Sequence, residues 1–112
     1  MKFKDLKFVE TKSPDGIQAL MQFGLYELSV VQNDISYGGK AGLYEIGVFV
    51  NDLLVELPGI TAKNDTVNGF LTEQEVEAIM HKLYLISARA RGPVQRQVEK
   101  YATRISLEDI RY

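Results

Sequence analysis

Two copies of nearly the same eleven residues constrain the fold of this chain more than any other feature. The first copy, GLYELSVVQND, runs from Gly24 to Asp34, and the second, GLYEIGVFVND, runs from Gly42 to Asp52. Alternate positions in both copies are apolar, and the positions between them include a glutamate and a small residue. This period of two is typical of a β-strand that has one face on the core and the other partly in water. The repeat therefore predicts two neighbouring antiparallel strands.

Each copy ends in Asn-Asp, a pair that favours turns because both side chains bond nearby backbone and tolerate positive φ. After the second copy, Asn51-Asp52 predicts the tip of a tight hairpin, with residues 53–57 as the return strand. The first copy leads instead into YGGKAG, where three glycines predict a flexible connection whose tip carries Tyr37 and Lys40.

The remaining segments before residue 70 give weaker signals. Residues 6–11 alternate and contain a lysine, which predicts a short edge strand. Residues 17–23 are compatible with either helix or strand, because Ala, Leu and Met favour a helix within a pattern that favours a strand. Residues 60–69 are predicted to form a loop, with at most a short strand at 60–62.

The clearest local signal is a helix over residues 73–90. Thr72 and Glu75 form a capping box, in which hydroxyl and carboxylate each satisfy an unpaired backbone N–H. One apolar stripe is expected to face the core. It comprises Val76, Ile79, Met80, Leu83, Ile86 and Ala90. Leu85 falls on the opposite face, which predicts that the second half of the helix is covered from two sides.

Gly92-Pro93 is predicted to end this helix and can start another, because proline fits the first helical turn. Val94, Val98, Tyr101 and Ile105 follow at spacings of 4, 3 and 4 and form one narrow apolar stripe. The second helix, at about 93–105, is expected either to fold back on Leu85 or to pack against another subunit. The chain is thus predicted to be one α+β domain over 1–112, with an antiparallel sheet of three to five strands and the main helix on one face.

Charge is unevenly distributed along the chain. Residues 1–87 hold seven Lys against twelve Asp or Glu, whereas residues 88–112 hold six Lys or Arg against three acids. The C-terminal extension 88–112 is therefore basic, but the acidic body and a pI of about 5.4 do not favour a nucleic-acid partner. Cysteine is absent, which excludes disulfides and thiolate metal sites. The first ten residues alternate charge and hydrophobe, so neither a signal peptide nor a membrane span is expected.

Few residues suggest catalysis. His81 is the one histidine, and with Glu77 it makes a helical i, i+4 pair that is more typical of a solvated surface than of a metal site. The YGGKAG stretch departs from the phosphate-binding loop pattern at two positions. Glu27 and Glu45 share one sheet face, where paired carboxylates can hold a cation or a proton, or simply meet lysine and water. No catalytic, cofactor-binding or metal-binding residue is predicted, and the chain is not expected to be an enzyme.

Two motifs resemble a recurrent type of small tailed-bacteriophage protein, over residues 25–87. Such proteins have a Tyr-Gly-Gly stretch leading to Gly-Leu-Tyr-Glu, and later a Leu-Thr-Glu-x-Glu-Val helix start. The matching residues are Tyr37, Gly38, Gly39, Gly42, Leu43, Tyr44, Glu45, Leu71, Thr72, Glu73, Glu75 and Val76. The resemblance implies a phage origin and a compact α+β fold, and it carries over no catalytic residues.

A phage origin predicts a non-enzymatic accessory protein that binds a host or phage protein in the host cytoplasm. Inhibition of a host or anti-phage defence factor is the expected consequence of that binding. The alternatives are a virion or assembly protein that forms an oligomer, and a small nucleotide- or nucleic-acid-binding protein. The partner is expected to contact the glycine-rich tip and the basic extension. The residues concerned are Tyr37, Lys40, Leu85, Arg89, Arg91, Arg96, Tyr101 and Arg104.

Overall fold

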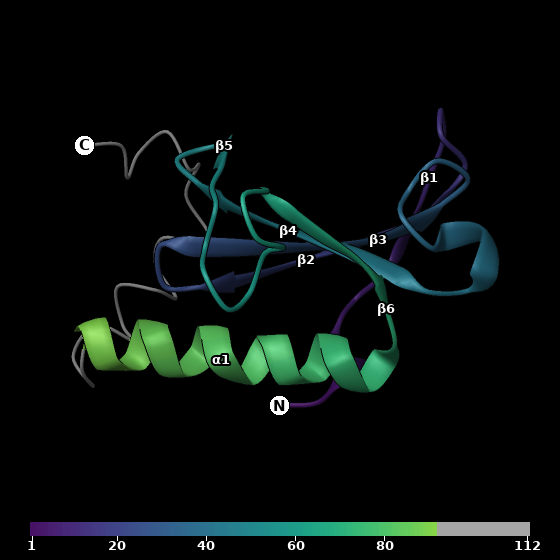
Figure 1. Cartoon of the computed structure of the whole chain (residues 1–112). Coiled ribbons are helices and arrows are strands. Elements are labelled where there is room, and N and C mark those ends of the chain that lie inside the picture. The colour runs from purple at the N-terminus through teal and green to yellow at the C-terminus, as the bar shows by residue number, and fades with distance from the viewer. Residues whose placement is uncertain (92–112) are drawn as a thin grey trace.

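The structure, a computed structural model, describes residues 1–91, and side-chain environments through residue 87. Within this range, six strands form one antiparallel sheet and α1 lies across one of its faces (Figure 1). The elements are η1 (Phe3–Asp5), β1 (Val9–Thr11), β2 (Gly16–Phe23), β3 (Tyr26–Asn33), η2 (Gly39–Ala41), β4 (Tyr44–Val50), β5 (Leu53–Leu54), β6 (Val67–Leu71) and α1 (Glu73–Arg91). The predicted α+β class is confirmed, with one strand more than the three to five expected.

The first five strands follow one another in the sheet in the order of the sequence. The order is β1-β2-β3-β4-β5, and β6 joins the same edge of β4 as β5. The segment 17–23, ambiguous in sequence, forms most of strand β2. The predicted hairpin tip is confirmed, because Asn51 and Asp52 have φ of +54° and +66° between β4 and β5. Positive φ at both central residues is the type I′ geometry that matches strand twist. The return strand is shorter than predicted.

The two copies of the repeat pair with each other as β3 and β4, as predicted. Leu28 lies opposite Val48 and Val30 opposite Ile46, and all four side chains are at most 1% exposed. Because the strands are antiparallel, the start of one copy lies beside the end of the other. The predicted buried face of the repeat is therefore the centre of the core.

Strand β6 corrects the prediction that residues 60–69 form a loop with at most a short strand at 60–62. Residues 67–69 belong to β6, whose Asn68 lies opposite Ile46 and whose Leu71 lies opposite Tyr44. Two residues thus separate the paired positions on β6 where one separates them on β4, which is a β-bulge. Asn-Gly inside the strand favours a turn locally, and pairing with β4 overrides that preference.

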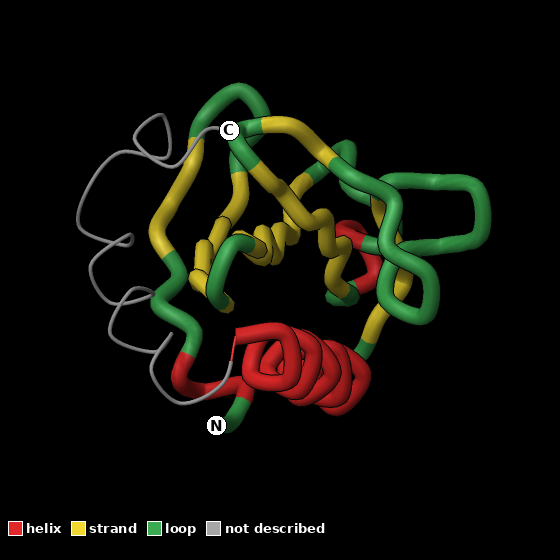
Figure 2. The backbone as a smooth tube through the Cα atoms, turned by 90° about the vertical axis from the view of Figure 1, so that its left-hand side faces the viewer, coloured by secondary structure: helices red, strands yellow, loops and turns green. Residues whose placement is uncertain are grey.

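Helix α1 begins as the sequence predicts. The Thr72 N–H donates to Glu75 Oε1 at 2.9 Å, and the Glu75 N–H donates to Thr72 Oγ1 at 3.2 Å. The stripe side chains Val76, Met80 and Leu83 are fully buried beneath the sheet, which curves over the helix in Figure 2. Each such burial contributes about 1.5–3 kcal/mol. The side chain of Ala90 and the predicted helix at 93–105 lie outside the described residues.

No helix among residues 1–91 is both long enough and apolar enough to cross a membrane.

Candidate functional site

The connection between β3 and β4 is held by its own hydrogen bonds, although its glycines predicted a flexible link. The Asn33 side-chain oxygen accepts the N–H groups of Ile35 and Ser36 at 3.0 and 2.8 Å. Gly38 and Gly42 flank η2 with φ of +89° and +78°. A Cβ on Gly39 would overlap the Asn33 carbonyl oxygen, so only glycine fits there. The connection therefore has a defined shape.

Tyr37 is fixed within this connection by contacts to two other strands. Its N–H donates to the Glu45 carboxylate in β4 at 2.7 Å, and its carbonyl accepts the N–H of Phe70 in β6 at 3.0 Å. Its Cβ packs directly against Gly69, where any side chain would overlap it. The backbone of Tyr37 is thus held from both sides, while its side chain remains 56% exposed.

Phe70 completes an aromatic pair with Tyr37 on the surface. The two rings stack with centroids 6.4 Å apart and planes inclined by 19°. Phe70 is 64% exposed and has φ of +56°, a conformation that bulky residues rarely adopt. The bulge in β6 accounts for both facts, because bulges re-aim side chains at the cost of local strain. Ile35, in the same connection, is 78% exposed, and Lys40 is also exposed.

Phe70 is the residue of this surface that sequence reasoning missed. Tyr37 and Lys40 were predicted as contact residues, whereas Phe70 was not. No local pattern indicates its exposure, because the bulge in β6 depends on long-range pairing with β4.

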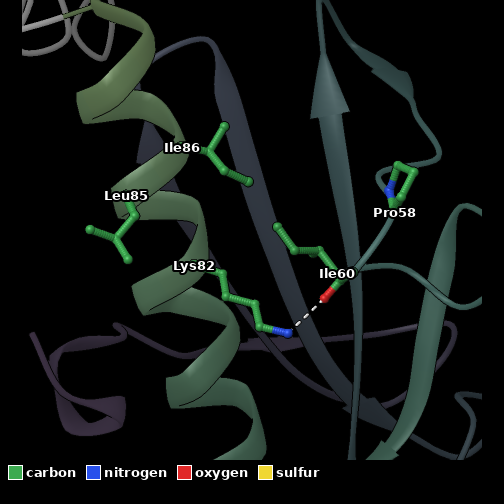
Figure 3. A pocket seen from close by; sticks show the side chains of 6 residues that line it. Pro58, Ile60, Lys82, Leu85 and Ile86 are labelled. Atoms are coloured by element: carbon green, nitrogen blue, oxygen red, sulfur yellow. Dashed lines mark hydrogen bonds between the residues drawn. The ribbon is translucent and has the colours of Figure 1, made fainter.

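The outer face of α1 carries a second apolar surface, as predicted for Leu85. Leu85 is 56% exposed and points away from the sheet (Figure 3). Two open hollows flank it. One, of about 480 Å³, is lined by Met1, His81, Tyr84 and Leu85. The other, of about 250 Å³, is lined by Pro58, Gly59, Ile60, Lys82, Leu85 and Ile86 (Figure 3). The Lys82 ammonium donates to the Gly59 carbonyl at 2.9 Å and ties the helix to this loop.

Among the described residues, the structure does not bring Leu85 close to Tyr37 and Lys40. The connection with Tyr37 and Lys40 lies at the end of the sheet where α1 begins, whereas Leu85 belongs to the far half of α1 (Figure 1). Arg89 and Arg91 fall in the last turns of α1, where no side chain is described. The remaining predicted contact residues, Arg96, Tyr101 and Arg104, lie outside the described residues.

Glu27 and Glu45 share a sheet face, as predicted, but they do not form a carboxylate pair. Glu27 lies opposite Phe49, and Glu45 lies opposite Val31, four positions along β3. At about 3.4 Å per residue, that offset separates them by roughly 14 Å along the strands. Glu45 accepts the Tyr37 N–H, whereas burial, with the nearby charge of Asp52 adding to it, raises the pKa of Glu27. The two glutamates therefore have separate structural environments.

Glu77 and His81 both contact the backbone of the N-terminal residues. Glu77 accepts the Phe3 N–H at 2.7 Å, and His81 Nε2 lies 2.9 Å from the Met1 carbonyl oxygen. Across residues 1–91, no three His, Asp or Glu side chains gather closely enough to hold a metal ion.

Comparison of the chain with protein-family models, curated proteins and solved structures finds no match.

Proposed function

We propose that this chain is a non-enzymatic protein-binding protein whose principal contact is the aromatic pair Tyr37–Phe70. The observation that carries the proposal is that two large aromatic rings are mostly exposed, while the Tyr37 backbone is bonded to the Phe70 N–H and to the Glu45 carboxylate of β4. Aromatic side chains dominate the binding energy of protein interfaces. Anchors that are already ordered lose little further entropy on binding, which favours affinity.

The fold gains little from placing Phe70 where it lies. Its backbone conformation costs on the order of 1–3 kcal/mol, and its ring buries only about a third of its surface, judged from the 64% exposure. A partner that covers both rings removes this apolar surface from water, and this burial stabilises the complex. The strain is therefore better explained by binding than by stability.

The proposed partner is a host protein or a component of anti-phage defence, met in the cytoplasm of an infected cell. The resemblance to small tailed-phage proteins supports this setting. The first motif of this resemblance runs from Tyr37 to Glu45 in the sequence. The Tyr37 N–H donates to the Glu45 carboxylate across the connection. The residues that carry the resemblance are thus those that hold the aromatic pair in place.

An oligomeric virion or assembly protein is the second candidate. The exposed Leu85 and the hollows beside it favour it, because such a face can join subunits. Light scattering on the purified chain distinguishes the two candidates: a large ring or lattice supports assembly, and a small species supports binding of a different protein.

Affinity capture from infected cells tests the proposal. The full chain is compared with Phe70→Gly, with Tyr37→Ser and with Leu53→Ala, in which an equally exposed side chain at the β4–β5 hairpin is removed. We expect one protein to be recovered with the wild type and with Leu53→Ala but lost with the two aromatic variants. Recovery that is unaffected by the aromatic variants and lost on truncation at Gly92 would instead assign binding to the C-terminal extension.

A further inference from the structure

We propose that the sheet face opposite α1 binds an extended peptide segment that carries two basic residues and one apolar residue midway between them. The centre of this surface, here called the outer hollow, has a volume of about 180 Å³. It is lined by Ser29, Val31, Glu45, Ile46, Gly47, Phe49, Leu54 and Val67. The lining includes neither ring of the aromatic pair, so the inference does not rest on the proposed function.

Gly47 creates the outer hollow, because it has no side chain at the centre of the face. Ser29 and Val67 lie opposite Gly47 on the two neighbouring strands. A Cβ on Gly47 would come within 3.0 Å of Leu54 Cδ2 and 3.6 Å of Val67 Cγ1, so these side chains surround an empty position. The Ser29 hydroxyl already accepts a hydrogen bond from Gln18 Nε2 at 3.0 Å. The hollow therefore favours an apolar side chain over water.

The size of the outer hollow suits one side chain. An apolar cavity of about 150 Å³ holds a benzene molecule, and the outer hollow measures about 180 Å³. Val31 and Phe49 line it from β3 and β4, and Leu54, which is 44% exposed, lines it from β5. A leucine or phenylalanine side chain of a partner fits this space.

The charge of the face favours a basic segment. The six described strands contain Glu10, Glu27 and Glu45 but no lysine or arginine. Glu27 and Glu45 lie diagonally across Gly47, one toward each end of the hollow. Lysine or arginine side chains of a partner are attracted to these carboxylates. A second copy of the face would set carboxylates against carboxylates, and nucleic acid or an anionic membrane would be repelled.

The spacing of the two carboxylates matches an extended chain. Glu27 and Glu45 are separated by roughly 14 Å along the strands, which is the rise of four extended residues at about 3.4 Å each. Side chains at positions i, i+2 and i+4 of an extended segment point the same way. Basic residues at i and i+4 therefore reach the two glutamates while an apolar residue at i+2 enters the hollow.

Titration of the full chain with blocked synthetic peptides, followed by NMR of the amide signals at neutral pH, tests the inference. The test peptide has the core Lys-Ser-Leu-Ser-Lys. One control peptide replaces its leucine with serine, and the other replaces both lysines with glutamate.

The protein variants alter the hollow and its charges separately. Gly47→Val fills the hollow, and Gly47→Ala is a smaller change that keeps the test valid if valine displaces Leu54. Glu27→Gln and Glu45→Gln each remove one charge, and Glu10→Gln removes an exposed carboxylate of β1 as the control. The amide spectrum of each variant without peptide confirms that it folds.

We expect the test peptide to bind with a dissociation constant on the order of millimolar, because it buries one side chain and forms two partly exposed ion pairs. The amide signals expected to shift are those of Ser29, Gly47 and Val67. Gly47→Val and the peptide without leucine are expected to weaken binding at least about tenfold, and Gly47→Ala by less. Glu27→Gln and Glu45→Gln are expected to weaken it about twofold to fivefold each, and Glu10→Gln to leave it unchanged.

Binding of equal strength by Gly47→Val and the wild type would overturn the proposal, and so would equal binding of the peptide with two glutamates. Titration to about ten millimolar test peptide without shifts on this face would also overturn it. A wild-type dimer that Gly47→Val dissociates, measured by light scattering, would assign the face to a second copy instead.

Discussion

The backbone N–H of Phe70 donates to the carbonyl of Tyr37 at 3.0 Å, and their exposed rings stack with centroids 6.4 Å apart. This relationship joins the β3–β4 connection to the bulge in β6. It brings together two side chains that are 33 positions apart in the sequence. The surface that we propose for binding depends on this contact.

Replacing Phe70 with glycine is expected to leave the free energy of unfolding within about 1 kcal/mol of the wild type. Glycine adopts this positive φ without the strain that the same φ causes for phenylalanine. Phe70→Ala loses the ring and keeps the strain, so it is expected to be the less stable variant. In an ordinary strand the order is reversed, with alanine more stable than glycine by about 0.5–1 kcal/mol. Urea unfolding of both variants measures the order, and a more stable alanine variant would show that Phe70 is not strained.

Two glycines of the β3–β4 connection are expected to respond differently to alanine. Gly39→Ala places a methyl group on the Asn33 carbonyl oxygen, so the connection must shift, at a cost of at least about 2 kcal/mol. Gly42→Ala has open space around the new methyl group and strains only its positive φ, at about 1 kcal/mol. Thermal unfolding compares the two, and equal losses would contradict the packing described for Gly39.

Glu45 is expected to control the position of Tyr37 through one hydrogen bond. Glu45→Ala removes the acceptor of the Tyr37 N–H, whereas Glu45→Gln keeps a side-chain oxygen in the same place. Losing the acceptor costs about 1–3 kcal/mol where water does not replace it. Amide hydrogen exchange at Tyr37 is therefore expected to accelerate in Glu45→Ala and to change little in Glu45→Gln. Similar exchange in both variants would mean that the bond does not order the connection.

Stability is expected to depend on pH through Glu27. Burial first and the charge of Asp52 second raise the pKa of this carboxyl above its ordinary value of 4.5, so the folded state binds its proton more tightly than the unfolded state. The contribution of Glu27 to stability is therefore present below pH 4.5 and is lost as pH rises through the folded pKa. The Glu27→Gln side chain does not ionise, so this variant lacks the loss of stability at higher pH.

Denaturant unfolding at pH 4 and pH 7 checks this dependence. We expect Glu27→Gln to be more stable than the wild type at pH 7 and to differ little from it at pH 4. Glu10→Gln, at an exposed carboxylate of β1, serves as the control. A Glu27→Gln variant that is less stable at pH 7 would contradict the cause assigned to the shift.

Local signals in the sequence were sufficient to predict the elements that depend on neighbouring residues. The alternation of the repeat identified β3 and β4, Asn51-Asp52 identified the hairpin tip, and the Thr72–Glu75 box identified the start of α1. Each of these signals acts within a few residues, so tertiary packing had little to change.

The candidate site could be predicted only in part, because its geometry depends on long-range pairing. Strand β6 owes its conformation to β4, and Asn68-Gly69 alone favours a turn. The exposure of Phe70 follows from the resulting bulge, and no local pattern indicates it. Strand alternation correctly placed Glu27 and Glu45 on one face, but only the antiparallel register shows that they lie four positions apart.

The most direct test of the central claim is the dissociation constant of the captured partner for the wild type and for Phe70→Gly, measured by calorimetry at equal pH and salt. Phe70→Gly is the suitable variant because it removes a ring while its backbone conformation remains allowed. If the aromatic pair is the principal contact, binding weakens at least about thirtyfold, which corresponds to about 2 kcal/mol for an interface hot spot. A dissociation constant that is unchanged within a factor of about two would contradict the account, because such a ring contributes almost nothing to binding.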